Sequence, residues 1–196
     1  MENRVATVTR KTRETDIAVS LKIDGSGEGQ VSTGIGFFDH MLDQLCRHSL
    51  MDLNIAVKGD LHIDDHHTIE DTGIALGQAF AEAVGDKKGI IRFGWAAVPL
   101  DEALALVSLD LSGRGFLCCE MGAMAEKVGD FTAEMLPEFL RAFAASAGIT
   151  LHVRILTGSN SHHKIEATFK ALAQALRAAI TRDERIGGIP STKGVL

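Results

Sequence analysis

Apolar and polar residues alternate along several short stretches of the chain, which is the pattern of half-buried β-strands. In the first half of the chain these stretches are residues 5–9, 17–23 and 53–57. In the second half they are residues 95–100, 104–111, 116–121 and 149–156. Glycine-rich turns such as residues 24–27 follow some of them, so we expect strands that are joined by tight turns.

Other apolar residues recur every three or four positions, as they do on the buried face of a helix. One predicted helix places four apolar residues on a single face: Phe38, Met41, Leu42 and Leu45. A second helix lies within residues 131–147, and two longer ones begin near Asp64 or Asp65 and near Asn160. Residues 187–196 contain too many helix breakers to be helical. Strands and helices follow in blocks, which predicts an α+β fold with a sheet covered on one face.

One short string occurs twice, as Asp65-His66-His67-Thr68-Ile69-Glu70 and as Ser161-His162-His163-Lys164-Ile165-Glu166, 96 positions apart. Residues 19–27 resemble residues 107–115 at an offset of 88, and residues 53–57 resemble residues 151–155 at an offset of 98. The shared order of these segments indicates an internal duplication. We expect half-domain repeats at residues 1–92 and 93–196, packed as one unit because no linker-like segment separates them.

The repeated string places two histidines and a glutamate in the first turn of a helix. His66 and Glu70 are i,i+4 neighbours, and His67 and Glu70 are i,i+3 neighbours. Histidine and carboxylate together suit a divalent transition metal. Adjacent histidines diverge by roughly 100° around the helix axis, so they are better placed to serve two ions than one. A single copy could equally be a polar helix start, but the repetition favours metal binding.

Composition excludes several classes of protein. The 196 residues suit one domain or two small ones, and the formal net charge is −6 at pH 7. No basic run suggests nucleic-acid binding. No stretch is apolar enough for a membrane span or a signal peptide. Cys46, Cys118 and Cys119 lack zinc-site spacing and fit a reducing, cytoplasmic setting.

A series of longer motifs then identifies a family. The motifs are Gly36-Phe37-Phe38-Asp39-His40-Met41, Asp65-His66-His67-Thr68-Ile69-Glu70-Asp71, Asp110-Leu111-Ser112-Gly113-Arg114, Asn160-Ser161-His162-His163-Lys164-Ile165-Glu166-Ala167, Phe169-Lys170-Ala171 and Pro190-Ser191-Thr192-Lys193-Gly194. Taken in order over essentially the whole chain, they closely resemble imidazoleglycerol-phosphate dehydratases, enzymes of histidine biosynthesis.

The resemblance implies two tandem half-domains, each a four-stranded sheet backed by helices, of the ribosomal protein S5 domain 2-like type. It implies a homo-oligomer of twenty-four chains and two manganese ions (Mn2+) per active site, with sites shared between subunits. The implied metal ligands are His40, His66, His67, Glu70, Glu138, His162, His163 and Glu166. Glu14 matches the catalytic position, and the implied substrate-binding residues are Glu14, Gln44, Arg92, Arg114, Lys170, Ser191 and Lys193.

The implied reaction converts imidazoleglycerol phosphate to imidazole-acetol phosphate plus water. The carbon-bound proton that leaves has no adjacent carbonyl, so it is not acidic by itself. An imidazole held between two metal ions can lose its ring proton, because the ions act as Lewis acids. The metal-bound imidazolate can then expel the hydroxyl to give a diazafulvene intermediate, whose neighbouring proton a carboxylate can remove. We assign that general base to Glu14, which would otherwise be read as a solvated residue before an edge strand.

The phosphate of the substrate requires fixed cations, and arginine offers bidentate geometry where lysine offers a point charge. Arg92 and Arg114 lie beside glycine-containing segments, and Lys170 follows Glu166 by one helical turn. Ser191 and Lys193 lie in a breaker-rich tail that could order over bound substrate. Each of these residues alone would be an ordinary surface residue. We expect three further histidines to be structural, with His152 pointing out of a strand: His48, His62 and His152.

Glu138 departs from the family pattern, because many relatives carry a metal-binding histidine there. The repeat aligns Glu138 with His40 at the offset of 98, and a carboxylate is also a competent manganese ligand. The alternative is a solvated acid at a helix start after Pro137.

Two other classes of function fit part of the pattern. A non-catalytic oligomeric metal-binding or storage protein would explain the duplicated ligands, but it needs no phosphate-binding arginines. A two-metal hydrolase would need an open position for water on the ions. The phosphate-binding residues therefore favour the dehydratase over the storage protein.

Overall fold

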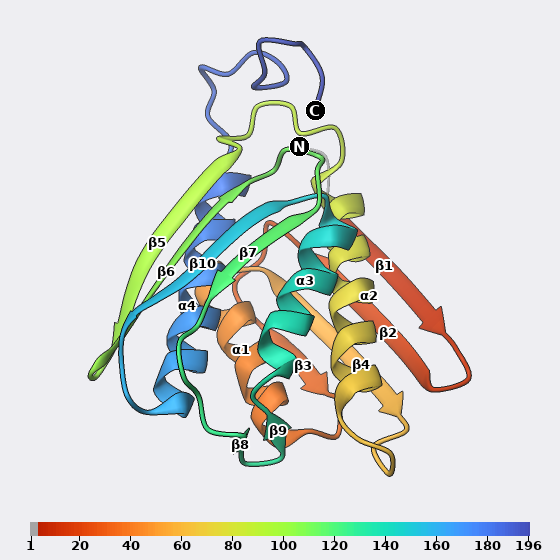
Figure 1. Cartoon of the computed structure of the whole chain (residues 1–196). Helices are drawn as coiled ribbons and strands as arrows, with labels where there is room; N and C mark the ends of the chain where they lie inside the picture. The colour runs from red at the N-terminus through yellow and green to blue at the C-terminus, as the bar shows by residue number, and fades with distance from the viewer. Residues whose placement is uncertain (1–3) are drawn as a thin grey trace.

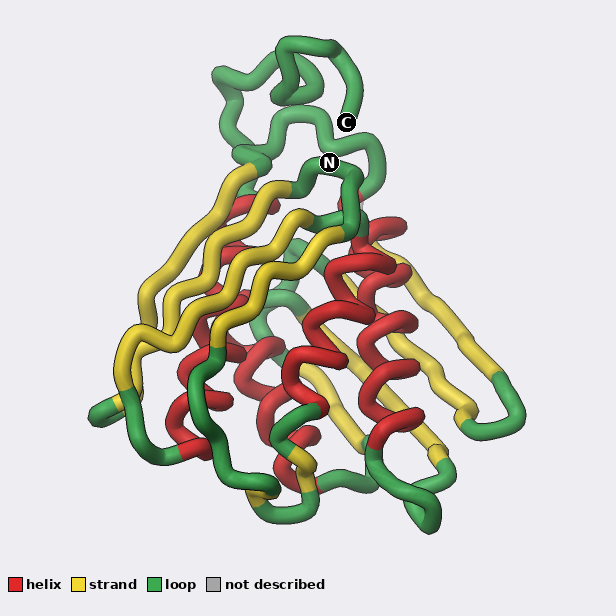
Figure 2. Tube along the Cα trace, viewed as in Figure 1, coloured by secondary structure: helices red, strands yellow, loops and turns green. Residues whose placement is uncertain are grey.

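In the computed structural model, which describes residues 4–196, two four-stranded sheets lie on either side of four helices (Figures 1 and 2). The first half of the chain forms β1 (Val5–Lys11), β2 (Thr15–Lys22), β3 (Gly29–Ser32), α1 (Gly36–Ser49), β4 (Asp52–Gly59) and α2 (His66–Val84). The second half forms β5 (Phe93–Leu100), β6 (Ala103–Asp110), β7 (Phe116–Glu120), β8 (Lys127–Val128), β9 (Phe131–Thr132), α3 (Met135–Ala147), β10 (Thr150–Thr157) and α4 (Ser161–Ile180).

The two sheets repeat one topology. Their strand orders are β1-β2-β4-β3 and β5-β6-β10-β7, and a separate ribbon joins β8 to β9. In each sheet the parallel pair is the last one, β3 with β4 and β7 with β10, while the other pairs are antiparallel. This repetition confirms the predicted α+β fold with an internal duplication. The division of the chain between residues 92 and 93 remains a prediction.

The apolar periodicities set which faces are buried. In β2 the side chains of Ile17, Val19 and Leu21 are buried, and the residues between them face outward. In α1 all four predicted apolar residues are buried. Two features departed from the pattern: β3 has no apolar alternation, and α3 occupies only part of residues 131–147, since Phe131 and Thr132 pair with β8. Residues 187–196 contain no helix, as predicted.

The helices form the middle of the molecule, between the sheets (Figure 1). α1 and α2 pack on the first sheet, α3 and α4 pack on the second, and across the middle α1 meets α4 while α2 meets α3. Aromatic rings join the two halves, with Phe38 edge-on to Phe139 at 5.3 Å and Phe80 edge-on to Phe143 at 5.8 Å. Each helix that carries the repeated string therefore contacts a helix of the other half.

Two glycines bring α2 very close to α3. A Cβ at Gly73 would lie 2.9 Å from the Phe139 carbonyl oxygen, and one at Gly77 would lie 2.7 Å from that of Phe143. Only hydrogen fits at these positions, so the backbones of the two helices lie almost in contact. Within residues 4–196, no helix is both long and apolar enough to cross a membrane.

Candidate functional site

Three predicted ligands converge where α1 meets α4. His40 of α1 and His162 of α4 direct their Nε2 atoms at the same oxygen of Glu166, at 3.3 and 3.0 Å. One ligand atom from each of the three residues lies within 4.8 Å of the others, and no other such group occurs among residues 4–196. Two imidazoles and one carboxylate are a donor set that suits a divalent transition metal. The residues present therefore fit a metal ion, and both halves of the chain supply them.

Glu166 is held as a carboxylate. Its side chain is only 11% exposed, and Lys170 Nζ lies 2.7 Å from its second oxygen. Burial opposes ionisation, but hydrogen bonds from Lys170 and His162 outweigh it and keep the pKa of Glu166 below its usual value. The predicted placement of Lys170 on the same helix face as Glu166 is confirmed. The pair supplies a negative ligand with a cation directly behind it.

An aromatic side chain fixes the His162 ring. Phe37 contacts that ring edge-on with 4.9 Å between centroids, and Phe37 packs in turn on Phe131 at 5.7 Å. Asp130 accepts hydrogen bonds from the backbone nitrogens of Gly36 and Phe37, which anchors the start of α1. Phe37 belongs to a sequence motif, but its role against His162 was not predicted.

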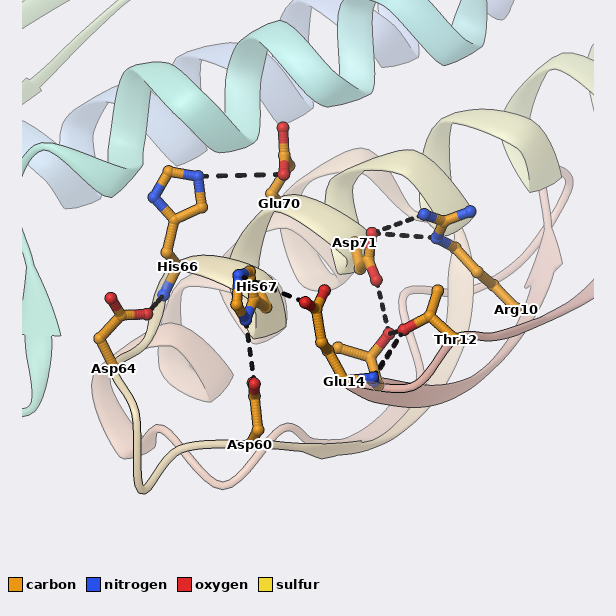
Figure 3. Close-up of polar contacts among 10 residues, drawn as sticks. Arg10, Thr12, Glu14, Asp60, Asp64, His66, His67, Glu70 and Asp71 are labelled. Carbon is orange, nitrogen blue, oxygen red and sulfur yellow. Dashed lines mark hydrogen bonds and ion pairs between the residues drawn. The ribbon is translucent and has the colours of Figure 1, made fainter.

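The equivalent histidine of the first half lies at the interface of α2 with α3. His66 Nε2 is 3.9 Å from Glu70, and both side chains lie on the side of α2 that faces α3 (Figure 3). Glu138, in the first turn of α3, forms an ion pair with Arg141 and lies outside the converging donor group. The charge of Glu70 also acts on Arg141. The predicted role of Glu138 as a ligand thus remains a prediction, and its carboxylate here binds a cation.

His67 points away from α3, toward the tip of the β1–β2 hairpin (Figure 3). Its Nδ1 donates to Asp60 at 3.0 Å, and its Nε2 is 3.9 Å from Glu14. The hydrogen bond with Asp60 and the nearby charge of Glu14 raise the pKa of His67. Asp60 follows β4 directly and belongs to none of the recognised motifs, so no sequence pattern pointed to this contact.

The hairpin tip that carries Glu14 is fastened to α2 (Figure 3). Asp71 accepts hydrogen bonds from Thr15 Oγ1 at 2.5 Å and from two nitrogens of Arg10 at 2.8 and 3.0 Å. The Glu14 backbone nitrogen donates to Thr12 Oγ1. These bonds hold the backbone of Glu14 beside the first turn of α2 and leave its side chain half exposed.

His163 has the same kind of surroundings as His67, but other residues supply them. Its Nδ1 donates to Glu102 at 2.7 Å, and its Nε2 is 3.9 Å from Asp101. The bond with Glu102 raises the pKa of His163, and the same bond helps to lower the pKa of Glu102 to about 2. Asp101 and Glu102 form the β5–β6 turn, and sequence reasoning missed both.

A cationic pocket of about 860 Å³ lies at the other end of the molecule. It is lined by four predicted substrate-binding residues: Arg92, Arg114, Ser191 and Lys193. Arg92 is fixed by two hydrogen bonds to Asp110, at 2.7 and 3.0 Å, and a third to the Pro190 carbonyl oxygen at 2.8 Å. The hydrogen bonds to Asp110 raise the pKa of Arg92. The pocket thus combines fixed positive charge with residues of the C-terminal tail.

The pocket and the converging histidines cannot serve one small molecule within a single chain. The backbone nitrogen of Arg92 donates to the Ala179 carbonyl oxygen at the end of α4, whereas His162 lies in the first turn of that helix. The rise of a helix separates the two positions by roughly 25 Å. Figure 1 shows the same arrangement, with the C-terminal tail and the starts of α2 and α4 at opposite ends.

The remaining predicted residues have simpler surroundings. Gln44 Oε1 bonds to His48 Nε2 at 3.1 Å, within α1. Burial and the nearby charge of Lys170 lower the pKa of His48, which places this pair beside the Glu166 cluster. His152 is exposed on β10, as predicted.

Comparison with known proteins gives one consistent answer. The family model described as imidazoleglycerol-phosphate dehydratase matches residues 33–176. The chain is 61% identical over 193 residues to the imidazoleglycerol-phosphate dehydratase of Thermoanaerobacter pseudethanolicus, covering 98% of this chain and 100% of that one. It is 57% identical over 196 residues to that of Desulforamulus reducens, covering both chains fully.

Two solved structures share the fold. The Staphylococcus aureus imidazoleglycerol-phosphate dehydratase matches with a TM-score of 0.83 and 39% identity, over 91% of this chain and 99% of that one. The Pyrococcus furiosus enzyme, solved in complex with (S)-C348, matches with a TM-score of 0.84 and 37% identity, over 96% of this chain and 100% of that one.

Proposed function

The chain belongs to the imidazoleglycerol-phosphate dehydratase family, and on that premise we propose how its own residues remove water from imidazoleglycerol phosphate. The family consists of hydro-lyases of histidine biosynthesis, so the bond that breaks is a carbon–oxygen bond. The observation that carries the proposal is the convergence of His40, His162 and Glu166 within 4.8 Å. The product is imidazole-acetol phosphate.

Eight side chains hold two manganese ions in this proposal, and they are His40, His66, His67, Glu70, Glu138, His162, His163 and Glu166. Bound ions would act as Lewis acids that favour loss of the substrate's ring proton. The Glu138 carboxylate, which forms an ion pair with Arg141, binds an ion in its place in this proposal, because it is a competent oxygen donor. Lys170 holds the Glu166 carboxylate in place from behind.

Glu14 acts as the general base in this proposal. Loss of the substrate hydroxyl leaves an electron-poor ring, and the neighbouring carbon-bound proton becomes acidic. Glu14 lies 3.9 Å from Nε2 of His67, on a backbone fixed by Thr12 and Thr15. Its carboxylate can therefore receive a proton beside the ligands without being a ligand itself.

Arg92, Arg114, Ser191 and Lys193 bind the phosphate of the substrate in this proposal, because their pocket concentrates fixed donors and positive charge. Gln44 lies beside the Glu166 cluster, and we propose that it contacts the imidazole end of the substrate. This pocket also favours an enzyme over a metal-storage protein, which has no need to bind an anion.

The active site is shared between subunits in this proposal. Phosphate-binding residues and the converging histidines lie at opposite ends of one chain, so a substrate must contact residues of different chains. A closed homo-oligomer of twenty-four chains in the cytoplasm supplies such neighbours.

The test is a direct assay. Protein loaded with manganese is incubated with imidazoleglycerol phosphate, and formation of the enolisable ketone is followed. Ketone formation that stops after chelation and returns with manganese supports the proposal. Manganese binding without any ketone would instead favour the non-catalytic metal-binding protein, and release of inorganic phosphate would favour a hydrolase.

A further inference from the structure

The two halves of the chain give equivalent histidines the same pair of carboxylate contacts. His67 has Asp60 on Nδ1 at 3.0 Å and Glu14 on the Nε2 side at 3.9 Å. His163 has Glu102 on Nδ1 at 2.7 Å and Asp101 on the Nε2 side at 3.9 Å. Each ring therefore has a bonded carboxylate on Nδ1 and a more distant one facing Nε2.

These contacts come from different places in the two repeats. The position equivalent to Asp60 at the offset of 98 is Gly158, which has no side chain. Glu102 is the equivalent of Glu14 at the offset of 88, yet it bonds to Nδ1 rather than facing Nε2. A carboxylate bonded to Nδ1 is thus present in both halves, although it comes from positions that are not equivalent in the repeat. Such a recurrence indicates that the histidine needs that bond.

Glu102 is itself rigidly held. Its other oxygen accepts hydrogen bonds from the backbone nitrogens of Ser159, at 3.1 Å, and Asn160, at 2.7 Å. Asn160 caps α4 by accepting from the His163 backbone nitrogen at 3.3 Å. The carboxylate therefore joins the β5–β6 turn, the cap of α4 and the His163 ring in one network.

We propose that Glu102 is a positioning residue that keeps the proton of His163 on Nδ1 and directs Nε2 outward, toward a divalent metal. A carboxylate accepts hydrogen bonds only, so a neutral ring bonded to it must carry its proton on the bonded nitrogen. The opposite nitrogen then has a lone pair for a metal, and its direction is fixed. Carboxylates in this position typically change metal affinity by 10–100-fold. The inference rests on the proposed function only in taking His163 as a metal ligand.

Glu102→Gln tests this assignment. The amide oxygen can still accept from Ser159 and Asn160, while the amide nitrogen toward His163 can only donate. The ring must then accept at Nδ1 and carry its proton on Nε2, where a metal cannot bind. We expect Mn²⁺ affinity to fall by about 10–100-fold. The visible spectrum of the Co²⁺-loaded protein should change, and relative to wild type the variant should lose more thermal stability with manganese present than without it.

Two further variants complete the experiment. Glu28→Gln removes an exposed carboxylate elsewhere and should leave metal affinity unchanged. Glu102→Asp keeps the charge with a shorter reach and should recover part of the affinity. Wild-type metal affinity in Glu102→Gln overturns the assignment. If that variant keeps its affinity and loses equal thermal stability with and without metal, Glu102 has only a structural role. A wild-type protein that binds no manganese contradicts the proposed function itself, which separates the two failures.

Discussion

Among single residues, Glu14 is the one whose chemistry can be tested most cleanly. It lies beside His67 but is not one of the eight proposed ligands, so its loss should not remove a metal ion. We expect Glu14→Gln to lower kcat by about 100-fold or more, because the amide cannot accept the proton. Manganese content per chain should stay at the wild-type value.

Glu82→Gln is the matched control for this change, since Glu82 is an exposed glutamate near the far end of α2. It should leave kcat and manganese content unchanged. If Glu14→Gln retains near-normal kcat, the base lies elsewhere. If the variant loses manganese, Glu14 is a ligand and the assignment is also wrong.

Asp52 illustrates how one carboxylate can fix a loop. It accepts hydrogen bonds from the backbone nitrogens of Ser26, Gly27 and Glu28 at 2.7, 3.1 and 3.2 Å. The bonds from Ser26 and Glu28, led by the one from Ser26, lower the pKa of Asp52 to about 2. Because the folded-state pKa is depressed, the stabilisation is present above about pH 4 and is lost as the pH falls toward 2.

We therefore expect Asp52→Asn to reduce the free energy of unfolding by roughly 1–2 kcal/mol at pH 7. The difference from wild type should shrink at pH 3, where the carboxylate of the unfolded chain has largely gained its proton. Urea unfolding at fixed protein concentration at both pH values measures it. A difference that is equal at pH 7 and pH 3 would rule out this ionic role.

At this scale the sequence predicted the types of functional residue better than their partners. The repeated string singled out His162 and Glu166, but no local pattern shows that His40, 126 positions away from Glu166, meets them. Asp60 and Glu102 carry no motif, because their role depends only on a turn that the fold brings near a histidine. Such contacts are set by tertiary packing, which periodicity does not encode.

Among the elements, the segment from Met121 to Thr132 connects the starts of three helices. Asp130 binds the start of α1, Thr132 donates to Asp65 at the start of α2, and Ala125 donates to Ser161 at the start of α4. Asp64, rather than Asp65, accepts from the first backbone nitrogen of α2. The proposed ligands on separate helices are thus held at fixed relative positions by one short connection.

The close contact of α2 with α3 depends on glycines, which have no side chain. A Cβ at Gly77 would lie 2.7 Å from both the Phe143 carbonyl oxygen and Ser146 Cβ. Alanine usually favours a helix over glycine by about 1 kcal/mol, so an exposed site would gain stability. Here we expect Gly77→Ala to reduce the free energy of unfolding by roughly 1–3 kcal/mol, because overpacking forces the helices apart.

Gly36→Ala serves as the control, since its new Cβ would meet only Asp130 at 3.6 Å. Denaturant unfolding of both variants should show a lower midpoint for Gly77→Ala alone. An unchanged or higher midpoint for Gly77→Ala would mean that α2 and α3 tolerate separation.

The sequence predicted the longer elements because their apolar periodicity extends over many residues. It missed β3, since Gly29-Gln30-Val31-Ser32 lies at a sheet edge with only one partly buried side chain. It also could not show that α1 meets α4 and α2 meets α3. That pairing follows from packing the two halves through their helical faces.

For the whole molecule, the proposed function implies that each chain carries two separated parts of an active site. The cationic pocket and the converging histidines lie at opposite ends of α4. In a homo-oligomer with shared sites, one chain's pocket serves another chain's ligands. Two variants that are damaged in different parts can then complement each other.

We expect such complementation between Arg114→Ala and His162→Ala when both chains are co-expressed with different tags and purified through both. Arg114 lines the pocket, and His162 belongs to the converging group. Each variant alone should be nearly inactive. With random mixing, about a quarter of the sites combine an intact pocket from one chain with intact ligands from another, so activity should approach about a quarter of wild type. The matched control pairs Arg114→Ala with Lys193→Ala. Both residues line the same pocket, so every chain in the mixture has a damaged pocket and no activity should be restored. If the first pair is no more active than its separate members, although mixed oligomers form, the pocket and the ligands belong to sites that are not shared.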